Sequence, residues 1–219
     1  MSVNDLKAWV SDGSNEGAVG VLEVSFRTLA LTIRLIKSKI VHVSSREDII
    51  AASLDVIRAG RAVSFDVVAK ETGLTKPGIL YHFKTKKDLM IAVVDSVAEV
   101  LESEMEGLLG QGVQEVPVAE RVRVYFEVAL TREADPADMA MYGDNRLREE
   151  LTGRWTQHMD RWFADLAELP VVERGTLTAV RLMADGLWFA SATSSGMPSQ
   201  DEIDVVRQSA LSLLGGGEK

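Results

Sequence analysis

The 219-residue chain contains no cysteine, which excludes structural disulfides and metal sites built from thiolates. Its three histidines, His42, His82 and His158, are scattered. It also lacks a glycine-rich phosphate loop, an H-E-x-x-H motif and a nucleophile elbow. We therefore expect no cofactor, no metal and no enzymatic activity. The remaining enzymatic alternative is an active site assembled from Ser, His and Asp residues that are distant in the sequence. No sequence pattern supports it.

Long uninterrupted apolar runs are also missing, so no membrane partner is expected. The most apolar stretch lies within residues 22–40, where Arg27, Arg34, Lys37 and Lys39 prevent a bilayer span. Two readings of residues 1–45 stay open: a poorly ordered or wrongly assigned extension, or an added helix. The first is favoured by the glycine- and serine-containing segment 11–20, and the second by helical spacing of apolar residues in 22–40.

Positive charge is scarce overall, because the formal net charge is −9. It is unevenly distributed: residues 91–219 carry −12, whereas five lysines and one acidic residue, Glu71, lie between Lys70 and Lys87. A local basic surface on an acidic body suits a protein that holds nucleic acid at one place. The lysine cluster thus indicates where to look for a DNA-binding surface.

The segment from Ser64 to Leu89, SFDVVAKETGLTKPGILYHFKTKKDL, has the pattern of a helix-turn-helix. Ser64 is a suitable cap for a first helix, and Thr75 for a second. Gly73 between them can adopt positive φ, which permits a sharp turn between two crossing helices. Thr85 can cap a third helix, whose first-turn backbone N–H groups would lie beside lysines and form a phosphate-binding site.

An exposed second helix would leave its polar residues free to enter a DNA major groove. The alternative interpretation is a solvent-exposed helical pair that does not bind DNA. Against it, the turn, the outward-facing Tyr81 and His82, and the lysine cluster coincide in one short window. The residues that we predict to serve DNA binding are Ser64, Thr75, Lys76, Gly78, Tyr81, His82, Thr85 and Lys86.

From Arg46 to about Val100, the chain resembles the TetR family of transcriptional regulators. The resemblance rests on Ala69, Gly73, Leu74, Thr75, Tyr81, His82, Phe83, Lys86 and Leu89. It implies an all-helical homodimer that binds a palindromic operator, mostly as a repressor, and leaves DNA when a small molecule enters its C-terminal domain. It also implies that Lys86 meets phosphate. One departure is Leu80, where many members have tyrosine, so the contacts of Leu80 and Tyr81 are the least defined.

Helical periodicity continues through most of the chain, and the expected fold class is all-α. We expect an N-terminal extension (1–45), a three-helix DNA-binding domain (46–92) and a helical ligand-binding and dimerisation domain (93–219). A long helix over 85–108 should link the last two. The expected helices are 46–59, 85–108, 118–132, 136–151, 153–169, 172–194 and 201–214, in addition to the helix-turn-helix pair.

Large apolar residues in the C-terminal half suggest a ligand pocket. The candidates are Phe126, Met141, Tyr142, Trp155, Met159, Trp162 and Asp185. Aromatic walls with an acid could hold a flat hydrophobic cation. The simpler reading is that most of these residues form a core, and that Asp185 pairs with Arg181 four residues earlier.

The last two helices are candidates for the dimer interface, because small residues alternate there with bulky apolar ones. The residues selected are Ala184, Leu187, Trp188, Val206 and Ala210. The family resemblance implies that both helices pair with their mates as a four-helix bundle. An intramolecular core is the alternative, since an apolar helix face does not reveal which chain covers it.

Together these observations predict a cytoplasmic DNA-binding regulator, most simply a homodimeric repressor released from a palindromic operator by a small hydrophobic effector. The alternative is a helical ligand-binding or scaffold protein whose DNA-binding face is degenerate.

Overall fold

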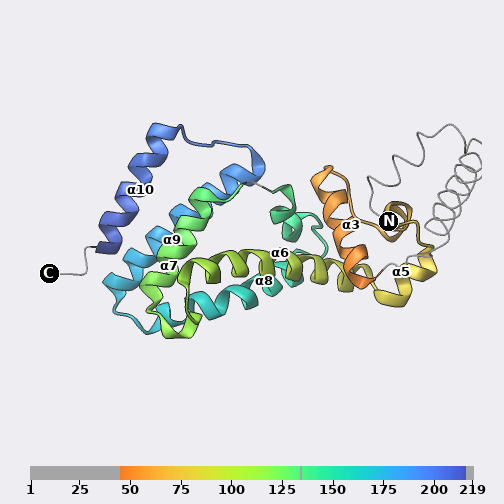
Figure 1. Cartoon of the computed structure of the whole chain (residues 1–219), viewed down its shortest axis with the longest axis horizontal. Helices are drawn as coiled ribbons and strands as arrows, with labels where there is room; N and C mark the ends of the chain where they lie inside the picture. Colours follow the sequence, from red (N-terminus) through yellow and green to blue (C-terminus); the bar gives the residue numbers. More distant parts are fainter. Residues whose placement is uncertain (1–44, 134, 216–219) are drawn as a thin grey trace, which may run out of the picture. The chain divides into compact units, whose positions relative to one another are not determined.

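The computed structural model describes residues 45–133 and 135–215, and these residues form helices and connecting turns without any strand (Figure 1). The all-α prediction is therefore confirmed. The alternatives for the N-terminal extension concern residues that, apart from Ser45, lie outside this described part. Within it, no helix combines the length and apolar character needed to cross a membrane.

The first three helices of the described part form the expected helix-turn-helix module: α3 (Arg46–Arg58), α4 (Phe65–Thr72) and α5 (Lys76–His82). The Oγ of Ser64 accepts a hydrogen bond from the Val67 N–H at 3.3 Å, and Thr75 Oγ1 accepts one from Gly78 N–H at the same distance. Gly73 ends α4 with φ +70°. All three predicted local signals are thus confirmed, and they fix where each short helix begins or ends.

Helix α6 (Lys86–Leu109) links two apolar cores. Thr85 and Asp88 form a reciprocal capping box at its start. Leu89 and Val93 are buried with the helix-turn-helix residues, whereas Leu101 and Met105 belong to the core of the C-terminal helices. The apolar stripe ends one turn earlier than predicted, because Leu108 is 57% exposed.

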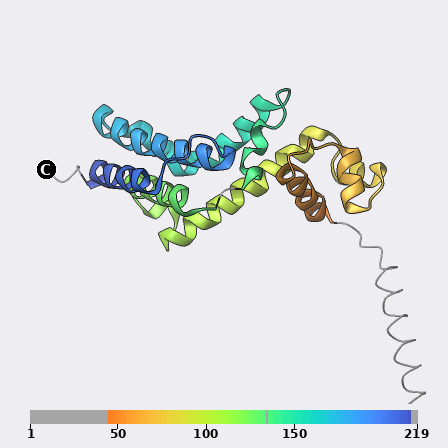
Figure 2. The same cartoon turned by 90° about the horizontal axis from the view of Figure 1, so that it is seen from above.

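Among its described residues, the C-terminal region contains four α-helices and three 3₁₀ segments. In order, they are η2 (Val113–Glu115), α7 (Val118–Thr131), η3 (Pro136–Tyr142), α8 (Arg148–Phe163), η4 (Ala164–Glu168), α9 (Val171–Thr193) and α10 (Gln200–Gly215). Helix α8 packs against α6, α7 against α9, and α10 against α9 (Figures 1 and 2).

The predicted break between the helices 136–151 and 153–169 was placed incorrectly. Residues 136–142 form only a 3₁₀ segment, and α8 then runs through Gly153 to Phe163. A glycine inside a helix costs only about 1 kcal/mol relative to alanine. That is too little to break a helix anchored by the buried residues Leu151, Met159 and Trp162.

Candidate nucleic-acid interface and ligand cavity

The outer face of α5 carries the side chains predicted to meet DNA. Tyr81 is 77% exposed, Thr75 and Lys76 are exposed, and His82 is half-buried with its ring perpendicular to that of Tyr81 at 5.1 Å. Ile79 and Phe83 are buried beneath this face. The structure therefore separates an inner packing face from an outer face with hydrogen-bonding groups.

Gly78 lies on the same helix and leaves its outer surface open. A Cβ added there would meet only ordinary contacts, the nearest being Thr75 Oγ1 at 3.5 Å. Folding therefore does not require glycine at this position, and its missing side chain allows closer approach of a partner. Leu80, where many family members have tyrosine, is half-buried, so Tyr81 is the more accessible of the two.

The hydroxyls of Ser64 and Thr85 act in capping, because each accepts a hydrogen bond from a backbone N–H of its helix. Their position at helix starts also places them beside unpaired first-turn N–H groups, which can donate to phosphate. Near them, Lys76 pairs with Asp66 at 3.1 Å, and both side chains are exposed. Such pairs are weak in water and yield readily to a phosphate.

The lysines at the start of α6 contact carboxylates from the C-terminal region, which sequence patterns did not reveal. Lys86 Nζ lies 2.7 Å from Asp144 Oδ2, and Lys87 Nζ lies 3.5 Å from Glu150 Oε1. The hydrogen bond from Lys86 holds the pKa of the Asp144 carboxyl below its ordinary value. Lys86 therefore has a protein partner in this DNA-free structure.

A second candidate site is a cavity of about 500 Å³ lined by residues from η3, α7, α8 and α9. Of the predicted ligand-binding residues, Tyr142, Trp155, Met159 and Asp185 line it. Phe126, Met141 and Trp162 instead lie in the packed cores, at 0–2% exposure. Helical spacing could not distinguish these two groups, because both satisfy the same apolar periodicity.

Two tryptophans form one wall of this cavity, with the rings of Trp155 and Trp188 stacked at 5.9 Å and an interplanar angle of 16°. Tyr125 Oη donates a 2.6 Å hydrogen bond to Asp185, and burial raises the pKa of the Tyr125 phenol, which favours its donor form. The expected Arg181–Asp185 contact is present but long, at 3.8 Å. Hence Asp185 is oriented chiefly by Tyr125.

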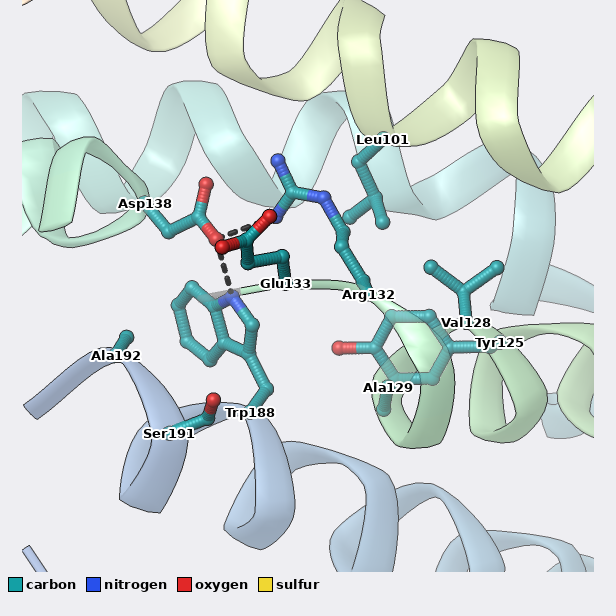
Figure 3. Close-up of a pocket in the computed structure, with 10 residues that line it drawn as sticks. All are labelled: Leu101, Tyr125, Val128, Ala129, Arg132, Glu133, Asp138, Trp188, Ser191 and Ala192. Atoms are coloured by element: carbon teal, nitrogen blue, oxygen red, sulfur yellow. Dashed lines mark hydrogen bonds and ion pairs between the residues drawn. The ribbon is translucent and has the colours of Figure 1, made fainter. Parts of the chain in front are cut away.

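A smaller cavity of about 20 Å³ shares Tyr125 and Trp188 with the larger one and has room for roughly one water molecule (Figure 3). The Trp188 Nε1–H donates to Asp138 Oδ2 at 3.2 Å, and Arg132 donates to the same oxygen. Asp138 is 2% exposed, and this burial raises the pKa of its carboxyl. Asp138 was missed because its partners lie six and fifty residues away, beyond any local pattern.

The residues selected for the dimer interface divide into two groups. Ala184, Leu187 and Ala210 are buried in the chain's own C-terminal core, so they are unavailable to a partner, and their placement in an interface is corrected. Trp188 and Val206 are half-buried. The exposed apolar side chains of α9 and α10 are instead Val171, Val172, Leu182, Phe189, Val205, Leu211 and Leu213.

Comparison with known proteins adds an independent line of evidence. Residues 49–93 match the family model for bacterial regulatory proteins of the tetR family, and residues 119–215 match the tetracyclin repressor-like C-terminal domain. No curated protein matches the chain. A solved structure of a TetR/AcrR-family transcriptional regulator from Thermobifida fusca is 25% identical, with 80% of this chain and 98% of that chain covered and a TM-score of 0.38. The two family models together span most of the chain, which belongs to the TetR family of DNA-binding transcriptional regulators rather than to an enzyme family.

Proposed function

We propose that this regulator is a cytoplasmic homodimeric repressor that binds a palindromic operator and is released by a small hydrophobic effector. The DNA-binding domain comprises residues 46–92, and the ligand-binding and dimerisation domain residues 93–219. The observation that carries the proposal is the exposed outer face of α5, held on a capped helix-turn-helix.

The side chains on that face have separate roles in the proposal. Lys76 and Tyr81 approach base edges in the major groove, and the missing side chain of Gly78 lets the helix enter closely. Thr75 and His82 border the groove. Ser64, Thr85 and Lys86 surround helix starts whose N–H groups bind the phosphates on either side.

The effector binds in the larger cavity, whose volume suits a small organic molecule. Trp155 and Trp188 offer flat apolar surface, and the cavity residues include two acids, Asp160 and Asp185, against one base, Arg181. Asp160 forms no ion pair within residues 45–133 and 135–215. A flat hydrophobic cation therefore fits this cavity better than an anion does.

The second subunit packs on the exposed apolar face of α9 and α10, for which Leu182, Phe189 and Val205 are the best candidates. Leu182 and Phe189 also line the larger cavity, so a partner on this face would cover part of its opening. Dimerisation would place two α5 helices about 34–36 Å apart, one DNA turn, to match a two-fold operator.

Two experiments test the proposal. Selection of bound sites from a random duplex pool at low salt should recover a palindrome; no enrichment would favour the scaffold alternative. Titration with tetraphenylphosphonium, a hydrophobic aromatic cation that does not intercalate into DNA, should then quench tryptophan fluorescence and release the selected duplex. A panel of such cations that neither quenches nor releases would contradict the cationic effector, while leaving the selected operator intact.

A further inference from the structure

The contact between Lys86 and Asp144 joins the two functional regions of the chain. Lys86 is the first residue of α6, where the proposed DNA-binding surface needs a free ammonium group for phosphate. Asp144 follows η3, in the C-terminal region. Their 2.7 Å separation is the length of a strong charge-assisted hydrogen bond, so one ammonium is held by a carboxylate at the position where phosphate would bind.

The Asp144 carboxylate is held in place from its own side as well. Its Oδ1 accepts the Arg146 backbone N–H at 3.0 Å, which leaves Oδ2 directed at Lys86. The side chain is about 20% exposed, less than its partner at 40%. Asp144 is thus a fixed acceptor rather than a freely moving surface acid.

The segment before Asp144 is anchored to the helix-turn-helix module. Ala140 and Met141, on η3, are each 2% exposed and belong to the same apolar core as Ile49 and Phe83. At the other end of η3, Asp135 receives three hydrogen bonds from the guanidinium of Arg58, the closest at 2.7 Å. The segment that positions Asp144 beside Lys86 therefore packs on the DNA-binding module itself.

We propose that Asp144 is a built-in competitor of DNA phosphate for Lys86, so that the free protein holds back one of its own DNA contacts. This inference rests on the proposed DNA-binding function. The two interactions compete because Asp144 accepts one of the three N–H donors of Lys86 and puts a negative charge beside the incoming phosphate. This competition lowers the affinity for the operator. A movement of Asp144 away from Lys86 would raise that affinity.

The neighbouring pair supplies a matched control. Lys87 and Glu150 also join the start of α6 to the C-terminal region, but at 3.5 Å and with both side chains more exposed. Glu150→Gln removes the same charge as Asp144→Asn at a nearby place. Comparing the two separates the specific contact from the general reduction of negative charge near DNA.

The test is a double-mutant cycle of duplex binding, measured by fluorescence anisotropy at fixed salt with the full chain. Asp144→Asn should tighten binding by about 2- to 5-fold, the range expected when a partly exposed ion pair no longer has to be broken. In the Lys86→Ala background, the same substitution should have no more effect than Glu150→Gln has. Equal effects in both backgrounds, unchanged affinity or weaker binding would each overturn the proposal.

A second measurement needs no DNA and separates this proposal from the proposed function. Thermal unfolding of the wild type, both single variants and the double variant should reveal favourable coupling between Lys86 and Asp144. Absence of coupling would refute the competitor role whether or not duplex binds. Coupling without duplex binding by any variant would refute the proposed function, and with it the competition for phosphate, while preserving the ion pair.

Discussion

Gly73 provides the sharpest prediction about how the DNA-binding module is built. It ends α4 at φ +70°, and a Cβ added there would meet nothing within 4 Å. The effect of Gly73→Ala therefore comes from backbone conformation and not from a clash with neighbours. Holding an L-residue in this left-handed region costs about 1–2 kcal/mol, so the free energy of unfolding should fall by about that amount.

Gly107 is the matched control, because it also has open space around its added Cβ but lies inside helix α6. Gly107→Ala should raise the free energy of unfolding by up to about 1 kcal/mol, since alanine is the better helix former. Gly73→Asn should lose less than Gly73→Ala, because asparagine tolerates the left-handed region. Chemical denaturation followed by circular dichroism measures all three. Equal stability of Gly73→Ala and Gly107→Ala would refute the reasoning.

Three further predictions follow from the charged and aromatic contacts. Lys86→Ala should weaken duplex binding across sequences and reduce the salt-dependence slope by about 1, and an unaltered slope would argue against a phosphate contact. Trp188→Phe keeps an aromatic wall but removes the donor to Asp138. If that bond couples the cavity to η3, tetraphenylphosphonium should still bind but release less duplex, whereas unchanged release would exclude the coupling. Burial raises the pKa of Asp95, but hydrogen bonds from Arg154 and His158, together with charge attraction, bring this pKa below its ordinary value. The ionised Asp95 carboxylate therefore stabilises the fold above its ordinary pKa near 3.8, and this stabilisation is lost as the pH falls through the lower pKa of the folded state. In Asp95→Asn, the free energy of unfolding should depend less on pH over that range.

The features that the sequence predicted correctly depend on residues close together in the chain. Ser64, Thr75 and Thr85 each cap the helix that follows within three residues, and Gly73 supplies the one backbone conformation that the turn needs. These interactions form within a single turn, so residue type and spacing are sufficient to find them. The DNA-binding module was therefore predictable almost element by element.

The contacts that connect the module to the C-terminal region were not predictable in this way. Lys86 and Asp144 are 58 residues apart, and Trp188 and Asp138 are 50 apart. Likewise, Trp155 lines the cavity whereas Trp162, two turns later on α8, is buried in the core. Tertiary packing decides these cases, and helical periodicity alone carries no information about which neighbour covers a face.

The most direct test of the central claim, that the outer face of α5 reads DNA, is a parallel selection of binding sites with the wild type and Tyr81→Ala. Tyr81 packs little against the rest of the described chain, so the variant should fold normally. Both proteins should recover palindromes with the same half-site spacing, and the variant should show relaxed preference at one position of each half-site. Identical base preferences in the two selections would contradict the claim.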